Sequence, residues 1–247
     1  MVSVRVHAPV VVFSVLCCTV TADVQHQGPL LFTSCGLELC RWRASGLEKQ
    51  LMGKKRVFWE ARDAGDCDAT LRQYQAHLKG TDTAGAVIFC VVGGKLSEGI
   101  NFGDELARCV VVMGLPYPDL SDPELNERLM HADRRATACG GGTREGAGKG
   151  ALGAAGREMY SNMCMQAVNQ CVGRAIRHAD DFSAVLLVDV RYTGAQGNRT
   201  AGTSSHSVIG KLPGWLTRRC TSSPESFGKA VQALGQFYAS MRVSAAS

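Results

Sequence analysis

The pattern of apolar positions predicts at least three strands that are buried on both faces of a sheet. They cover residues 86–92 (AVIFCVV), 109–113 (CVVVM) and 184–190 (AVLLVDV). Each run is short and rich in β-branched residues, and none alternates polar with apolar positions, which is typical of strands in a parallel sheet. A further apolar run at 10–15 could form another buried strand.

Helical patterns separate these strands. We expect helices over 45–60, 68–78, 122–135 and 158–178. A C-terminal helix is predicted by apolar residues that recur at helical spacing: Phe227, Val231, Leu234, Tyr238 and Met241. Strands that alternate with helices indicate an α/β layered domain with a twisted, mainly parallel sheet flanked by helices.

Two segments read as flexible loops. Residues 139–156 are rich in glycine, and residues 194–207 are rich in glycine, serine and threonine. The first contains Gly146-Ala147-Gly148-Lys149-Gly150, which resembles a phosphate-binding loop. That motif needs glycine where this chain has Thr143 and serine or threonine where it has Gly150. We therefore assign this segment no phosphate-binding role.

The N-terminal residues allow two interpretations. Arg5 and His7 precede the apolar run APVVVFSVLCC, and Val20-Thr21-Ala22 fits a small-residue cleavage site, so a secretory signal peptide is one of them. The other is the buried strand at 10–15. The run is too short to cross a bilayer as a helix, so we expect no membrane partner.

Composition changes this picture only slightly. A chain of 247 residues, 45% of them hydrophobic, can bury a sizeable core, and its net charge of +5 mildly favours a polyanionic partner. The eleven cysteines are odd in number and include no C-x-x-C pair. Several fall inside apolar runs, so we expect free thiols in a reducing compartment and no metal site.

The stretch GGKLSEGINF, residues 93–102, follows the first predicted strand directly. It therefore lies at the carboxyl end of a strand, where α/β folds bind ligands. Paired glycines let backbone N–H groups approach an anion closely. Lys95, Ser97, Glu98 and Asn101 add a cation, a hydroxyl, a carboxylate and an amide within seven residues. Taken alone, the pattern fits either a ligand-binding loop or a tight turn.

The stretch NQCVGRAIRH, residues 169–178, carries a polar stripe in an otherwise apolar segment. On a helix, Gln170, Gly173, Arg174 and Arg177 share one face because they follow i, i+3, i+4 and i+7 spacing. Arginine presents a rigid, always-charged fork that suits phosphate or carboxylate oxygens. The stripe therefore predicts either an anion-binding face or a solvated basic face.

Together the two stretches resemble motifs V and VI of superfamily 2 helicases, in the iron–sulfur, xeroderma-pigmentosum-group-D-like group. The flanking sequences GLPYP, MQAVNQ, DVRY and KLPGW, together with the closing helix, resemble the chromosome-loss (ChlR-type) branch of that group. The resemblance covers residues 46–242 and implies one RecA-like domain there. The apolar run at 10–15 resembles a remnant of the family's motif IV region, whereas residues 16–45 depart from the family's pattern. Residues 1–45 are therefore a segment of uncertain structure.

The resemblance implies roles for individual residues at a cleft that binds ATP with Mg²⁺. Arg174 and Arg177 are expected to act as arginine fingers on the γ-phosphoryl group. Residues expected to contact ATP are Gln170, Gly173, Glu98, Gly99 and Asn101. Lys95 and Ser97 are expected to contact the phosphates of a single DNA strand.

In this family a preceding domain supplies the phosphate-binding loop, the DEAH box and an iron–sulfur cluster held by cysteines. The present sequence contains no G-x-x-x-x-G-K-[ST] or DEAH. We therefore expect the C-terminal half of a nuclear ATP-dependent DNA helicase, with roles in DNA repair and chromosome cohesion, which needs an N-terminal helicase domain to hydrolyse ATP. The alternatives are a non-catalytic nucleic-acid-binding or interaction module derived from a helicase domain and, less in keeping with the motifs, a secreted protein.

Overall fold

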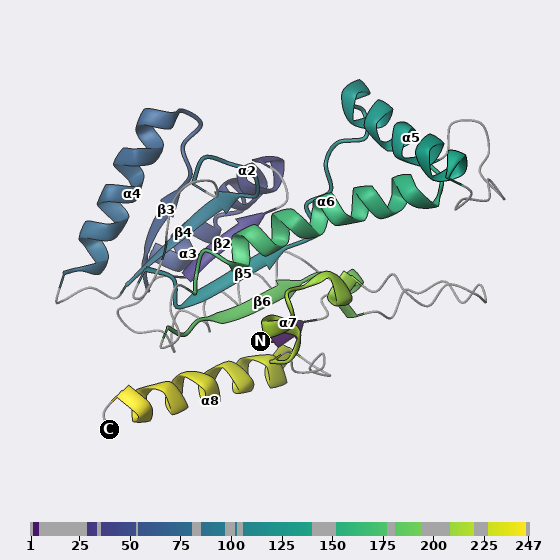
Figure 1. The fold of residues 1–247 in the computed structure, drawn as a ribbon. Helices are drawn as coiled ribbons and strands as arrows, with labels where there is room; N and C mark the ends of the chain where they lie inside the picture. The colour runs from purple at the N-terminus through teal and green to yellow at the C-terminus, as the bar shows by residue number, and fades with distance from the viewer. Residues whose placement is uncertain are drawn as a thin grey trace.

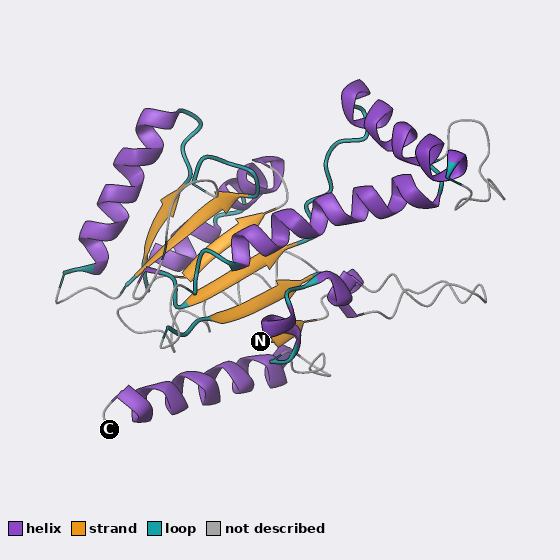
Figure 2. Cartoon of the chain, viewed as in Figure 1, coloured by secondary structure: helices purple, strands orange, loops and turns teal. Residues whose placement is uncertain are grey.

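Six parallel strands form a single twisted sheet in the computed structural model (Figures 1 and 2). The structure describes residues 2–4, 29–33, 36–52, 54–80, 85–96, 102, 106–139, 152–176, 181–193, 208–219 and 227–245. The spatial order of the strands is β1-β6-β5-β2-β4-β3. Their bounds are β1 Val2–Val4, β2 Pro29–Thr33, β3 Arg56–Trp59, β4 Ala86–Val91, β5 Cys109–Met113 and β6 Ala184–Val188.

Strand β2 lies at the centre of the sheet, although it comes early in the chain. Leu30 pairs with Ile88 of β4 on one side and with Val110 of β5 on the other. Neighbouring strands cover both edges of β2, and helices cover both of its faces, so Leu30, Leu31 and Phe32 are at most 2% exposed.

Helices cover both faces of the sheet (Figure 1). On one face, α4 (Ala64–Leu78) and α6 (Ala154–Val172) pack on a cluster that includes Phe32, Ile88 and Val112. On the other face, α2 (Gly36–Ala44), α3 (Leu47–Met52) and α8 (Phe227–Ala245) pack on Leu31, Phe89 and Val111. Alternate residues of each strand point to opposite faces, so one apolar strand contributes to both clusters.

The remaining elements are a projecting helix and short turns. Helix α5 (Pro123–Ala138) extends away from the sheet and packs against α6 through the buried Leu125 and Leu129 (Figure 1). The Asp133 carboxylate accepts hydrogen bonds from the N–H groups of Gly153 and Gly156, both at 2.7 Å. These bonds join the start of α6 to α5 and satisfy two N–H groups that the helix cannot pair internally. The turns are η2 Val190–Thr193, η3 Val208–Lys211 and α7 Gly214–Thr217.

The predicted α/β layered architecture is confirmed, including the parallel sheet and the position of β5. The helix expected over 45–60 is wrong, because α3 ends at Met52 and residues 56–59 form strand β3. This strand pairs with β4 from Arg56–Ala86 to Trp59–Phe89, and the pairing overrides the helical pattern read from the lysines before it. Strand β2 lies within residues 1–45, where the sequence predicted only a candidate strand at 10–15, and that run lies outside the described residues.

Helix boundaries also differ from those expected. Helix α4 begins at Ala64, four residues early, and α6 begins at Ala154 inside the predicted loop. Helix α6 ends at Val172, although the periodic pattern predicted a helix through residue 178. Trp215, in the KLPGW sequence, is 41% exposed, while its neighbours Leu212 and Leu216 are buried. Most of the loop at 139–156 and all of the loop at 194–207 fall outside the described residues.

Candidate functional site

The loop after β4 begins with a tight turn. Strand β4 ends at Val91, and the Gly94 N–H donates to the Val91 carbonyl at 2.9 Å. Gly93 has a φ of 75°, a conformation that L side chains rarely adopt, so the turn favours glycine at this position. Lys95 is exposed and Leu96 is completely buried, so the loop is anchored by one side chain and offers the other to solvent.

The carboxylate of Glu60 lies inside this loop and binds both of its ends. Its Oε2 accepts a hydrogen bond from the Val91 N–H at 2.7 Å, and its Oε1 accepts one from the Leu96 N–H at 2.8 Å. Glu60 follows β3, and its own N–H donates to the Phe89 carbonyl at 2.9 Å. A Cβ atom at Gly94 would lie 2.5 Å from Oε1, so glycine leaves the space that the carboxylate fills.

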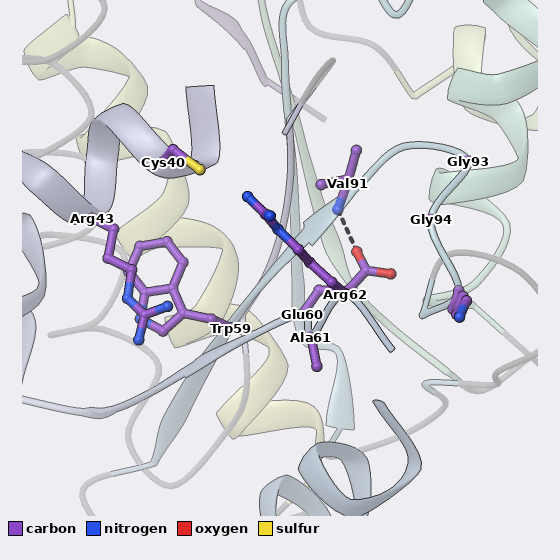
Figure 3. A pocket seen from close by; sticks show the side chains of 10 residues that line it. Cys40, Arg43, Trp59, Glu60, Ala61, Arg62, Val91, Gly93 and Gly94 are labelled. Carbon is purple, nitrogen blue, oxygen red and sulfur yellow. Dashed lines mark hydrogen bonds between the residues drawn. The ribbon is translucent and has the colours of Figure 1, made fainter. Parts of the chain in front are cut away.

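A cavity of about 730 Å³ opens beside this loop, at the carboxyl ends of β3 and β4 (Figure 3). The charged residues that line it are Arg43 from α2, Glu60 and Arg62 from the segment after β3, and Lys95. Trp59 also lines the cavity. One ring face stacks on Phe89 at 4.3 Å between centroids, and the Arg43 guanidinium lies 5.8 Å from the ring centroid. Three cations against one carboxylate make this cavity suited to an anion.

Helix α6 ends at Val172, inside the second predicted stretch, residues 169–178. Gly173 is the C-cap, and its N–H donates to the Asn169 carbonyl at 2.9 Å. The Arg174 and Ala175 N–H groups then donate to the carbonyls three residues earlier, at 3.3 Å each, which tightens the last turn. The expectation that Gln170, Gly173 and Arg174 share one helical face is therefore wrong, because only Gln170 belongs to the helix.

This turn still separates polar from apolar positions. Gln170 and Gly173 are exposed and Arg174 is half-buried, whereas Cys171, Val172 and Ala175 are at most 1% exposed. The buried residues hold the turn against the sheet and leave the polar ones at the surface. Arg177, Ser97, Glu98, Gly99 and Asn101 lie outside the described residues.

The core brings the flanks of the two stretches together. Leu96, Phe102, Cys171 and Ala175 belong to the same buried cluster. Burial raises the pKa of the Cys171 thiol to about 12, the Arg174 guanidinium acts in the opposite direction, and the Glu60 carboxylate reinforces the rise. Burial also raises the pKa of Cys90, again reinforced first by Glu60. Glu60 is thus electrostatically close to both stretches.

A second set of contacts ties α6 to the C-terminal part of the chain. The Asn169 amide donates to the Lys211 carbonyl at 3.1 Å. Lys211 Nζ donates to Glu158 Oε1 at 2.9 Å and to Asn162 Oδ1 at 2.6 Å. These bonds fix η3 along α6, so the helix that leads to Arg174 is held along most of its length.

Neither metal ligation nor membrane insertion is indicated by the described residues. Within them, no three His, Cys, Asp or Glu side chains gather as metal ligands. In the same part of the chain, no helix combines the length and apolar character required to cross a bilayer.

Sequence reasoning missed Glu60, Arg43 and Arg62. The available signal was an acidic residue at the end of an apolar stretch, Arg56–Trp59 followed by Glu60, but this stretch was assigned to a helix. Once β3 is recognised as a parallel strand beside β4, its carboxyl end must lie at the same edge of the sheet as Gly93 and Gly94.

Residues 19–203 of this chain match the family described as the helicase C-terminal domain. The match covers more than half of the chain. The chain belongs to this family, and its fold is the RecA-like α/β domain expected from the sequence.

Among its relatives are DNA helicases named CHL1 and DDX11. The chain is 40% identical over 198 residues to the ATP-dependent DNA helicase CHL1 of Meyerozyma guilliermondii. The aligned region covers 80% of this chain and 22% of the relative. It is 35% identical over 209 residues to the ATP-dependent DNA helicase DDX11 of Danio rerio. This aligned region covers 83% of this chain and 21% of the relative. The chain thus spans about a fifth of the length of these curated relatives.

A solved structure of XPD helicase is also similar. It shares 19% sequence identity and a TM-score of 0.39, and the match covers 73% of this chain and 28% of that chain.

Proposed function

We propose that this chain is the C-terminal motor domain of a CHL1- or DDX11-type ATP-dependent DNA helicase. In this proposal Arg174 and Arg177 stabilise the transferring phosphoryl group of ATP, and Gln170, Gly173, Glu98, Gly99 and Asn101 contact the nucleotide. Lys95 and Ser97 contact the backbone of a single DNA strand. The observation that carries the proposal is the QCVGRAIRH sequence, which begins in the last turn of a helix packed on the sheet, in a chain that belongs to the helicase family.

The geometry around Arg174 supports its part in this proposal. Buried Cys171 and Ala175 on either side anchor the backbone, so the guanidinium extends from a rigid turn. A cation held in advance where negative charge develops stabilises a transition state without reorganisation at the moment of reaction. Arginine also offers the planar fork that pairs with two phosphate oxygens.

The loop after β4 supports the DNA-binding part. Lys95 is exposed beside a cavity that Arg43 and Arg62 also line. DNA phosphates attract such cations without regard to base sequence, as a translocating motor requires. The run from Lys95 to Asn101 would then carry both DNA-contacting and ATP-contacting residues, so hydrolysis and strand movement could be coupled through one loop.

The remaining assignments follow from the family. We propose that Mg²⁺ enters as the partner of ATP, held chiefly by an N-terminal helicase domain that also supplies the phosphate-binding loop and the iron–sulfur cluster. We also propose that the protein acts in the nucleus, in keeping with DNA as its substrate.

Binding of the chain to single-stranded DNA is expected to be weak and strongly salt-dependent. For single strands, the logarithm of the binding constant falls with the logarithm of salt concentration by about 0.7 for each phosphate contacted. Fluorescence anisotropy of a labelled oligothymidylate between about 50 and about 200 mM salt measures this slope. Lys95→Ala should reduce the slope by about 0.7, whereas Lys79→Ala, a change at an exposed residue after α4, should leave it unchanged. A slope near zero for the unsubstituted chain would remove the DNA assignment.

Hydrolysis of ATP by these 247 residues alone should not exceed the rate in buffer, because the sequence contains no motif that holds Mg²⁺ and orients the attacking water. Joining the chain to the N-terminal domain of a CHL1-type helicase should restore DNA-stimulated hydrolysis. Phosphate release by both proteins checks this expectation. A joined protein that folds and binds DNA but does not hydrolyse ATP would favour the non-catalytic binding module instead.

A further inference from the structure

Glu60 closes the loop that joins β4 to Leu96. Its two carboxylate oxygens accept one hydrogen bond each, from the Val91 N–H at 2.7 Å and from the Leu96 N–H at 2.8 Å. These two donors are the first and last residues of the turn that contains Gly93, Gly94 and Lys95. One carboxylate therefore sets the separation of the loop's ends, because each of its oxygens accepts a hydrogen bond from one end of the loop.

The loop is shaped around this carboxylate. The space beside Gly94 is filled by Oε1, which would be 2.5 Å from a Cβ atom at that position. Hydrogen bonds to an ionised carboxylate are shorter and stronger than neutral ones. An uncharged replacement would leave at least one of the two N–H groups facing a poor acceptor.

Glu60 also lies near the second stretch. It is the first electrostatic contribution after burial to the raised pKa of Cys90, and it contributes to the raised pKa of Cys171, three residues before Arg174. The charge of Glu60 thus acts on buried thiols of both β4 and α6, although this residue follows β3, an element that neither stretch contains.

We propose that Glu60 is a positioning residue, which holds the loop of residues 91–96 in the form that presents Lys95 to a phosphate of single-stranded DNA. This inference rests on the proposed DNA-binding function of the loop. In this proposal an acidic residue favours the binding of a polyanion. Glu60 does so by holding the loop backbone, without contacting the DNA itself.

Glu60→Gln tests the proposal through the sign of its effect. Loss of a negative charge beside a polyanion should by itself strengthen DNA binding. If Glu60 positions the loop, affinity should instead fall by about 10-fold, the loss expected when a hydrogen bond to a charged group is removed. Asp63→Asn is the matched control. It makes the same change of charge three residues away, at an exposed residue whose side chain makes no capping hydrogen bond.

Hydrogen–deuterium exchange of the full chain gives a readout that does not depend on DNA. Glu60→Gln should accelerate exchange of the amides of Val91 and Leu96, and the exchange of α5 should be unchanged. Glu60→Asp keeps the charge but shortens the side chain, so it should also accelerate exchange at these two amides. Unchanged exchange at both amides in Glu60→Gln would overturn the positioning role, whatever the DNA result.

Gly94→Ala supplies an independent variant, because its Cβ atom would displace the same carboxylate. Alone it should weaken DNA binding about as much as Glu60→Gln, and combined with Glu60→Gln it should add less than about 2-fold, since residues that act through one contact are not additive. Full additivity, or tighter binding by Glu60→Gln, overturns the proposal. Absence of salt-dependent binding by the unsubstituted chain would instead overturn the proposed function, and the exchange data would still decide whether Glu60 shapes the loop.

Discussion

Replacing Arg174 with alanine is expected to slow ATP hydrolysis by about 10³–10⁵-fold in a protein that joins this chain to the N-terminal domain of a CHL1-type helicase. The expected loss is large because an arginine finger acts on charge that develops only as the phosphoryl group transfers. The affinity for ATP should change much less than the maximal rate, since the ground state carries less of that charge. Arg177→Ala should have an effect of similar size.

Substitution by lysine separates geometry from charge. Arg174→Lys should be nearly as damaging as alanine, because an ammonium group cannot reproduce the planar fork that pairs with two phosphate oxygens. Arg72→Ala, a change at an exposed arginine of α4, is the control and should leave the rate unchanged. Steady-state kinetics of ATP hydrolysis with saturating DNA measures both the maximal rate and the KM for ATP. If Arg174→Ala and Arg177→Ala hydrolysed ATP at near-normal rates, the polar stripe would be only a solvated basic face. The arginine-finger assignment would then be wrong.

Cys171→Asp is expected to unfold the domain. The Cys171 side chain is 1% exposed and lies in the cluster between α6 and the sheet. An isolated charge in such surroundings costs several kcal/mol even after relaxation, against a typical stability of about 5–15 kcal/mol for a domain. Aspartate would escape part of this cost by taking up a proton, but would still place an unsatisfied polar group in the core.

The neighbouring residue provides the control for this experiment. Gln170 is exposed on the same turn of α6, so Gln170→Asp should shift the urea midpoint only slightly. Circular dichroism during urea unfolding measures both variants, and Cys171→Ala shows the cost of lost packing alone. A Cys171→Asp protein as stable as Gln170→Asp would contradict the described packing of α6 on the sheet.

Local pattern was sufficient for some elements and not for others. Strand β5 matches its predicted bounds, Cys109–Met113, because five buried apolar residues in succession allow few other structures. Strand β3 has only four residues, of which Phe58 alone is buried, so its sequence carries little signal without its partner β4. The end of α6 was also missed. Its apolar periodicity continues past Val172. The helix nevertheless ends there, because after Gly173 the N–H groups donate to carbonyls three residues earlier and no longer four.

Among the candidate site residues, some are likewise indicated by local sequence and others are not. Arg174, Gln170 and Lys95 are candidates that the sequence alone supplies, because the residues around them form recognisable motifs within a few positions of the chain. Glu60 could not be predicted, because its partners Val91 and Leu96 are 31 and 36 residues away and meet it only through the pairing of β3 with β4. Contacts of this kind follow from the register of the sheet.

The strand order also has a consequence for how the chain acquires its fold during synthesis. The first strand, Val2–Val4, pairs with β6, whose residues 186–188 leave the ribosome more than 180 positions later, and β2 must wait for both β4 and β5. Closing such long loops is slow, because the entropy of the intervening chain is lost before the paired strands stabilise one another. Until residue 188 has emerged, the apolar edge of β5 that β6 later covers stays open to other chains. The nascent chain is therefore prone to aggregation through this edge until β6 has paired with β5.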